Sequence, residues 1–158
     1  MPQSKKGRAH SKSAKATPQV YVKILTEGAK VPKQAHEEDA GFDLIALDDI
    51  LIEGGEIETI PTGLAFEIPR GHYGQIKSRS SLALKGLSVD GGVIDRGFRG
   101  EVKVILCNRN KEGRIKISKG EKIAQIIFPR VLTAPLVEKK EDLSDTERGI
   151  FGFGSSGK

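Results

Sequence analysis

Apolar and polar positions alternate with a period of two along several short stretches of this chain. Residues 102–106 have the sequence VKVIL and residues 114–117 have the sequence RIKI. This period is typical of β-strands that bury one face. We expect strands at Val20–Leu25, Ile50–Ile52, Glu58–Ile60, Gly63–Ile68, Tyr73–Lys77, Glu101–Asn108, Arg114–Ile117 and Lys122–Phe128.

Turn-forming residues separate these stretches. Glycine, proline, asparagine and aspartate are frequent in the connections, and residues 108–113 (NRNKEG) predict a hairpin loop between two strands. Only Ser81–Lys85 predicts a short helix, with a hydroxyl at its start and Gly86 at its end. Many short strands with one short helix predict an all-β fold, a jelly-roll-like β-barrel.

The length and the distribution of charge limit the domain organisation. A chain of 158 residues suits one domain. Residues 1–17 hold 5 of the 26 basic residues and no acidic residue, which leaves 21 basic against 21 acidic side chains in the rest of the chain. We expect a disordered basic arm at 1–17, which could serve nuclear import, nucleic-acid binding or solubility or be an expression remnant, and a neutral domain at 18–140 with no nucleic-acid-binding face.

Few residues are available for disulfides or for a metal site made by protein side chains alone. Cys107 is the only cysteine and lies in an apolar run, where we expect it to be buried. The three histidines are scattered, so a zinc site is not expected. No stretch is long and apolar enough for a membrane span and no signal peptide begins the chain, so we expect an intracellular protein, cytoplasmic or nuclear, that is not secreted.

The C-terminal residues 148–157 (RGIFGFGSSG) combine glycines and hydroxyls with one arginine and two aromatic rings. Glycine backbones can approach a phosphate closely, and Arg148 adds a two-pronged donor. Phe153 lies between two glycines and can stack on a planar base. A frayed chain end is the alternative interpretation. We expect residues 141–158 to be a flexible arm that closes over an active site.

Two further segments carry groups suited to a metal and to phosphate. Asp43 lies in AGFDL after a turn, where it can hold a water on Mg²⁺ or, alternatively, cap its own turn. Residues 78–83 (SRSSLA) bring hydroxyls, free N–H groups and the Arg79 guanidinium to a helix start, which suits phosphate or simply a helix cap.

Residues 90–100 (DGGVIDRGFRG) form another such segment and predict a glycine-rich hairpin. Its backbone groups can recognise the edge of a pyrimidine, and Asp95 can take a proton from water. Phe98 is suited to enclosing a sugar. A hairpin with a turn-stabilising aspartate is the alternative.

The last segment, residues 120–128 (GEKIAQIIF), places Gln125 among apolar neighbours. A phosphate oxygen or water would satisfy its amide, as would an ordinary partner in the core.

Taken in order, these five segments resemble the motifs of the trimeric dUTPases, over roughly Val20 to Gly157. The resemblance implies a jelly-roll barrel assembled as a homotrimer, with active sites that borrow residues from all three chains. It implies Mg²⁺-dependent hydrolysis of dUTP to dUMP and diphosphate, which limits uracil in DNA and supplies dUMP for dTMP synthesis.

The resemblance also implies residue roles. Asp95 matches the base that activates water, and Asp43 matches the carboxylate that holds Mg²⁺ through water. The residues that match the family's phosphate-side contacts are Arg79, Ser80, Ser81 and Gln125. The backbone that recognises uracil in the family corresponds to Gly92, Val93 and Ile94, and the ring that packs on the sugar corresponds to Phe98. The arm that closes over the active site corresponds to Arg148, Phe153, Gly154 and Ser155.

Some positions depart from the family pattern. Ser81, Gly97, Phe98 and Phe151 replace a glycine, an aspartate, a tyrosine and a glycine. The sequence RSSL, which contains Ser81, and the sequence DRGF, which contains Gly97 and Phe98, lean toward the related dCTP deaminases, alone or bifunctional with dUTPase. Those enzymes carry a glutamate ten residues beyond the matching aspartate, and here that position is Ile105, which cannot shuttle a proton. A silent nucleotide-binding jelly-roll module is the other alternative.

Overall fold

The computed structural model describes residues 17–147 and Ile150. Within them lie ten strands and one helix: β1 (Tyr21–Ile24), β2 (Phe42–Ile45), β3 (Ile50–Glu53), β4 (Ile57–Glu67), β5 (Gly74–Lys77), α1 (Ser80–Ala83), β6 (Leu87–Asp90), β7 (Val93–Ile94), β8 (Val102–Asn108), β9 (Arg114–Ile117) and β10 (Lys122–Ile127).

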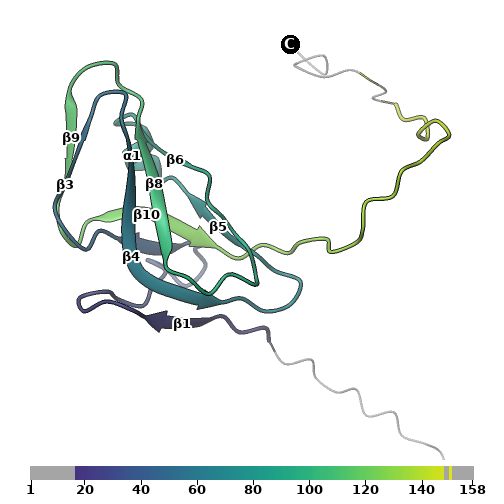
Figure 1. The fold of residues 1–158 in the computed structure, drawn as a ribbon, viewed down its shortest axis with the longest axis horizontal. Helices are drawn as coiled ribbons and strands as arrows, with labels where there is room; N and C mark the ends of the chain where they lie inside the picture. Colours follow the sequence, from purple (N-terminus) through teal and green to yellow (C-terminus); the bar gives the residue numbers. More distant parts are fainter. Residues whose placement is uncertain (1–16, 148–149, 151–158) are drawn as a thin grey trace, which may run out of the picture.

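The strands form three antiparallel sheets around one core (Figure 1). One sheet has the order β1-β4-β8-β6, a second has the order β2-β10-β5-β7, and β3 pairs with β9 in a two-stranded ribbon. The prediction of an all-β, jelly-roll-like barrel with one short helix is therefore confirmed. No helix among the described residues has the length and apolar character needed to cross a membrane.

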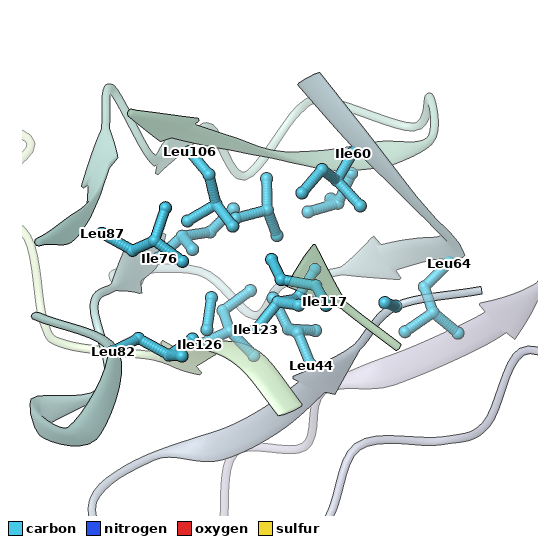
Figure 2. Packing of buried hydrophobic residues seen from close by; sticks show 14 of the residues in the cluster. Leu44, Ile60, Leu64, Ile76, Leu82, Leu87, Leu106, Ile117, Ile123 and Ile126 are labelled. Carbon is cyan, nitrogen blue, oxygen red and sulfur yellow. The ribbon is translucent and has the colours of Figure 1, made fainter. Parts of the chain in front are cut away.

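Aliphatic side chains from all three sheets and from α1 fill the core. Figure 2 shows Leu44 of β2, Leu106 of β8 and Ile117 of β9 among those packed together. In β8 the buried positions alternate as the sequence predicts, and Val102, Val104 and Leu106 are almost fully buried. Burying each such side chain stabilises the fold by about 1.5 to 3 kcal/mol.

β4 is one strand where the sequence predicts two. The pairing of β4 with β8 shifts register between Pro61 and Leu64, so the strand continues through a bulge. The bulge is held by Thr62 Oγ1, which donates to the Val102 carbonyl at 2.6 Å, and by the Gly63 N–H, which donates to Glu101 Oε1 at 2.9 Å. Proline and glycine mark a strand end in the sequence, but these long-range bonds keep the strand extended.

Neither expected hairpin forms. β8 pairs with β4 and β6 while β9 pairs with β3, so the loop at 108–113 carries the chain from one sheet to another. Likewise β6 pairs with β8 while β7 pairs with β5, and Gly91 and Gly92 cross between the sheets with φ of 66° and 90°. Local turn residues indicated a reversal of the chain, but the strand partners are distant in sequence.

Strands β2, β6 and β7 are absent from the sequence prediction because each is only two to four residues long and carries little alternation. The helix spans Ser80–Ala83 where Ser81–Lys85 is predicted, and its N-cap is Arg79, with no side-chain cap bond. Cys107 is only half-buried where the sequence predicts burial. Beyond β10, residues 131–147 form no helix or strand and lead away from the barrel (Figure 1).

Candidate functional site

Three charged side chains meet on the outer face of the β2-β10-β5-β7 sheet. Asp43 of β2 accepts from Arg79 Nε at 3.2 Å through Oδ1 and from Lys122 Nζ at 2.6 Å through Oδ2. The Asp43 side chain is 17% exposed, whereas that of Lys122 is 44% exposed. We call Asp43, Arg79, Lys122 and Gln125 the Asp43 cluster. It brings together three of the predicted site residues.

Gln125 lies directly opposite Asp43 in the β2–β10 pair. Its Nε2 donates to the Ser78 carbonyl at 3.2 Å, and Ser78 Oγ accepts from the Val89 N–H at 2.8 Å. A Cβ added at Gly41 would lie 2.1 Å from Gln125 Oε1. Gly41 is therefore needed for the observed position of the Gln125 amide.

A β-bulge explains how Lys122 joins this face. Two residues three apart in a regular strand point to opposite faces. In β10 the register shifts between Lys122 and Ala124, and Ile123 and Ala124 are both buried. Lys122 therefore points to the same outer face as Gln125, where it reaches Asp43.

Ser80 and Ser81 begin α1 beside Arg79. Both are exposed, and neither hydroxyl bonds to another group in the described part of the chain. Because Arg79 is the N-cap, the serine hydroxyls are not used as caps. They extend the Asp43 cluster with donors that suit a phosphate.

The predicted base-recognition segment lies at the edge of the same sheet. β7 is an edge strand, and Val93 and Ile94 pair with Gln75 and Gly74 of β5. The Gly92 carbonyl accepts from the Ile76 N–H at 2.8 Å, and a Cβ at Gly92 would lie 2.8 Å from the Ile76 carbonyl oxygen. Glycine is required there, since φ is 90° and the backbones touch.

Asp95 and Phe98 form the two ends of a turn, in which the Phe98 N–H donates to the Asp95 carbonyl at 3.0 Å. The Phe98 ring covers Gly100, where a Cβ would lie 2.7 Å from Phe98 Cζ. Asp95 is exposed and lines a cavity of about 880 Å³ together with Tyr73 and Arg96. A carboxylate so placed is open to water and to a ligand.

Within one chain Asp95 is remote from the Asp43 cluster. Along β5, Lys77 pairs with Gln125 and Gly74 pairs with Ile94. Three residues of strand span roughly 10 Å, and Asp95 lies one residue beyond Ile94. Asp95 and the Asp43 cluster therefore do not contact each other within one subunit.

The part of the chain that the structure describes contains no protein cage for a metal ion. No three histidine, cysteine, aspartate or glutamate side chains gather within residues 17–147. Asp43 is the single carboxylate of its cluster, and two cations already contact it. These residues fit an outer role, in which a carboxylate holds a water on a phosphate-bound Mg²⁺.

Some predicted residues lie outside the described part of the chain: Arg148, Phe153, Gly154 and Ser155. Conversely, Lys122 contacts Asp43 and Gly41 adjoins Gln125, so both join the candidate site although the sequence motifs do not single them out. Their signal was proximity in sequence to Gln125 and Asp43. For Lys122 the sequence predicts the wrong face of the sheet, because regular alternation places Lys122 on the opposite face from Gln125.

Comparisons with known proteins show the family of this chain. The profile of the dUTPase family matches residues 27–157. A deoxyuridine 5'-triphosphate nucleotidohydrolase from Nautilia profundicola is 47% identical over 140 residues, which are 87% of this chain and 97% of the relative.

Two solved structures extend the comparison. A variant of the Staphylococcus bacteriophage 80alpha dUTPase, solved with dUpNHpp, has a TM-score of 0.80 and 30% identity over 89% of this chain and 99% of its own. A dUTPase variant from phage phi11 of S. aureus, in which the coordination of a structural Mg(II) ion is described, has a TM-score of 0.73 and 26% identity over 78% of this chain and 97% of its own. By its family profile and its curated relatives, the chain belongs to the dUTPase family.

Proposed function

We propose that this protein hydrolyses dUTP to dUMP and diphosphate, which limits uracil incorporation into DNA and supplies dUMP for dTMP synthesis. Its family and the names of its relatives support the reaction. The observation that carries the proposal is the Asp43 cluster, in which a guanidinium, an ammonium and an amide gather around one carboxylate, with the hydroxyls of Ser80 and Ser81 next to Arg79 in the chain. This set of donors suits a polyphosphate.

The proposed reaction needs one base and a good leaving group. The oxygen of a water molecule attacks the α-phosphorus, and the proton of that water goes to Asp95. The bond from the α-phosphorus to the oxygen that bridges to the β-phosphate breaks, and its electron pair leaves with the diphosphate. Arg79, Ser80, Ser81 and Gln125 hold the phosphates in line for this displacement and stabilise the charge.

Mg²⁺ is part of the proposal. Bound to the triphosphate, it would neutralise phosphate charge, and Asp43 would hold one of its waters. The structural Mg(II) ion described in the phi11 dUTPase variant supports a metal in this family. The residues around Asp43 fit that role because they leave a single carboxylate next to the phosphate donors.

A homotrimer with shared active sites is the assembly that we propose. The separation of Asp95 from the Asp43 cluster within one chain supports it, because a second subunit is then needed to bring the base to the phosphates. The closing arm with Arg148, Phe153, Gly154 and Ser155 would come from residues 141–158, after the domain at 18–140. The basic arm at 1–17 has no assigned role in this scheme.

Base and sugar selection follow from the edge strand. A backbone N–H of Gly92, Val93 or Ile94 that faces position 4 of the base would donate to O4 of uracil and would oppose the amino group of cytosine, since two donors would meet. Phe98 would pack on deoxyribose.

With its single half-buried cysteine the protein suits a reducing, intracellular compartment, cytoplasmic or nuclear.

Deamination is disfavoured by the surroundings of Ile105. In the β6–β8 pair Ile105 lies opposite Asp90, and a Cβ at Gly91 would lie 3.6 Å from Ile105 Cδ1. A hydrocarbon side chain therefore occupies the position where a deaminase needs a proton carrier.

One assay tests the function. The protein is incubated with dUTP, dCTP, dTTP or UTP plus Mg²⁺, and diphosphate and ammonia are measured separately. We expect diphosphate from dUTP alone and no ammonia. Release of ammonia from dCTP would show that the protein is a deaminase instead. The absence of both products would favour a binding module.

A further inference from the structure

A second cavity borders the Asp43 cluster: Asp43 and Lys122 line it, and Arg79 does not. Its volume is about 520 Å³, within the range of about 300 to 1,000 Å³ that small-molecule sites occupy. The apolar side chains of Val31 and Ile45 are part of its lining, and Lys30, Lys33 and Lys122 are its cations. We call it the lysine pocket.

The charge of the lysine pocket is not balanced. Asp43 is its only acidic residue, and the oxygens of Asp43 already contact Lys122 and Arg79. Lys30 and Lys33 are exposed and make no ion pair with any residue in the described ranges. Two free ammonium groups therefore border a concave surface, which favours a compact, multiply charged anion.

The pocket is held in a defined place next to the phosphate donors. The Asp43 N–H donates to the Lys33 carbonyl at 3.0 Å, so the loop that carries Lys30 and Lys33 is tied to β2. Asp43 and Lys122 line the pocket and also belong to the Asp43 cluster. An anion that moves past Asp43 would thus leave Arg79 and meet Lys33 and Lys30.

We propose that the lysine pocket is the exit subsite for the diphosphate product. The proposal rests on the proposed function, because dUTP hydrolysis is what would deliver diphosphate beside Asp43. Diphosphate differs from the nucleotide product in carrying the larger charge without a base or sugar. Ammonium groups above an apolar floor attract that charge without the paired hydrogen bonds of an arginine, so the product is held weakly enough to leave.

The direct test is binding of inorganic diphosphate to the full-length protein by calorimetry, without nucleotide. Wild-type protein should bind diphosphate more tightly than inorganic phosphate. Lys30→Gln together with Lys33→Gln should weaken diphosphate binding about tenfold, since two partly exposed charge contacts are lost. The same variant should raise the inhibition constant of diphosphate in the dUTP assay by a similar factor.

The matched control is Lys116→Gln together with Lys119→Gln. It removes the same charge from exposed positions outside the pocket. The control should bind diphosphate as the wild type does, and Lys30→Arg with Lys33→Arg should retain binding.

If the pocket variant and the control weaken diphosphate binding equally, the effect comes from net charge and the proposal is overturned. Unchanged diphosphate binding in the pocket variant would also overturn it. Because binding is measured without nucleotide, it is separable from the reaction. A wild-type protein that binds diphosphate through Lys30 and Lys33 but does not hydrolyse dUTP would refute the function and leave an anion site.

Discussion

Lys122 Nζ lies 2.6 Å from Asp43 Oδ2, although regular strand alternation would place Lys122 and its strand neighbour Gln125 on opposite faces. The β10 bulge rotates Lys122 to the outer face, so a lysine, an arginine and an amide gather around one carboxylate. The face that results is rich in cations and donors and adjoins the lysine pocket. This arrangement underlies the proposed phosphate site.

Asp95→Asn should abolish most hydrolysis and leave nucleotide binding intact. The amide cannot take a proton from water, and loss of a general base lowers rates by about 10²- to 10⁴-fold. Turnover is followed by diphosphate release, and binding by calorimetry with a non-hydrolysable dUTP analogue. Release at the wild-type rate would show that Asp95 is not the base.

Gly41→Ala should lower kcat/KM for dUTP about 100-fold, because its Cβ would meet Gln125 Oε1 at 2.1 Å and displace the amide. A double-mutant cycle with Gln125→Ala checks the route. If Gly41 acts through Gln125, Gly41→Ala costs little in the Gln125→Ala background. Additive losses would mean that Gly41 acts elsewhere.

Asn108→Ala should lower the free energy of unfolding by about 2 kcal/mol or more. The buried Asn108 Nδ2 donates to the Ile52 carbonyl at 3.0 Å, and its Oδ1 accepts from the Asn110 N–H at 3.2 Å. Alanine removes both bonds and leaves the Ile52 carbonyl and the Asn110 N–H without these side-chain partners where the chain passes between sheets. Denaturant unfolding measures the loss. Lys111→Ala, in the same loop but exposed, should stay within about 0.5 kcal/mol of wild type.

Removal of residues 148–158 should lower turnover and preserve the proposed trimer, since Arg148 and Phe153 are proposed to contact the ligand and not to hold subunits together. Loss of donors to the transition state costs about 10²- to 10³-fold in kcat. Light scattering gives the size of the assembly and the diphosphate assay gives the rate. A truncated protein that runs as a monomer would assign the arm a structural role instead.

Much of the candidate site follows from the family resemblance. Residue types alone leave other interpretations open for Asp43, Arg79 and Gln125, whereas the resemblance assigns all three to the site, and the structure brings them together. Asp95 was predicted with them, yet one chain keeps it apart. Sequence motifs carry chemistry but not distance, so which residues meet within one subunit had to come from strand register.

The sequence by itself determined the class of fold and the donors available to the candidate site, because a period of two and the side-chain chemistry are local properties of the chain. The tertiary structure decided the partners of β8 and β9, the continuous β4 and the outward turn of Lys122. Those features depend on hydrogen bonds between residues far apart in sequence, such as Thr62 to Val102. Such pairings compete with local turn preferences, and their outcome depends on the packing of the whole core.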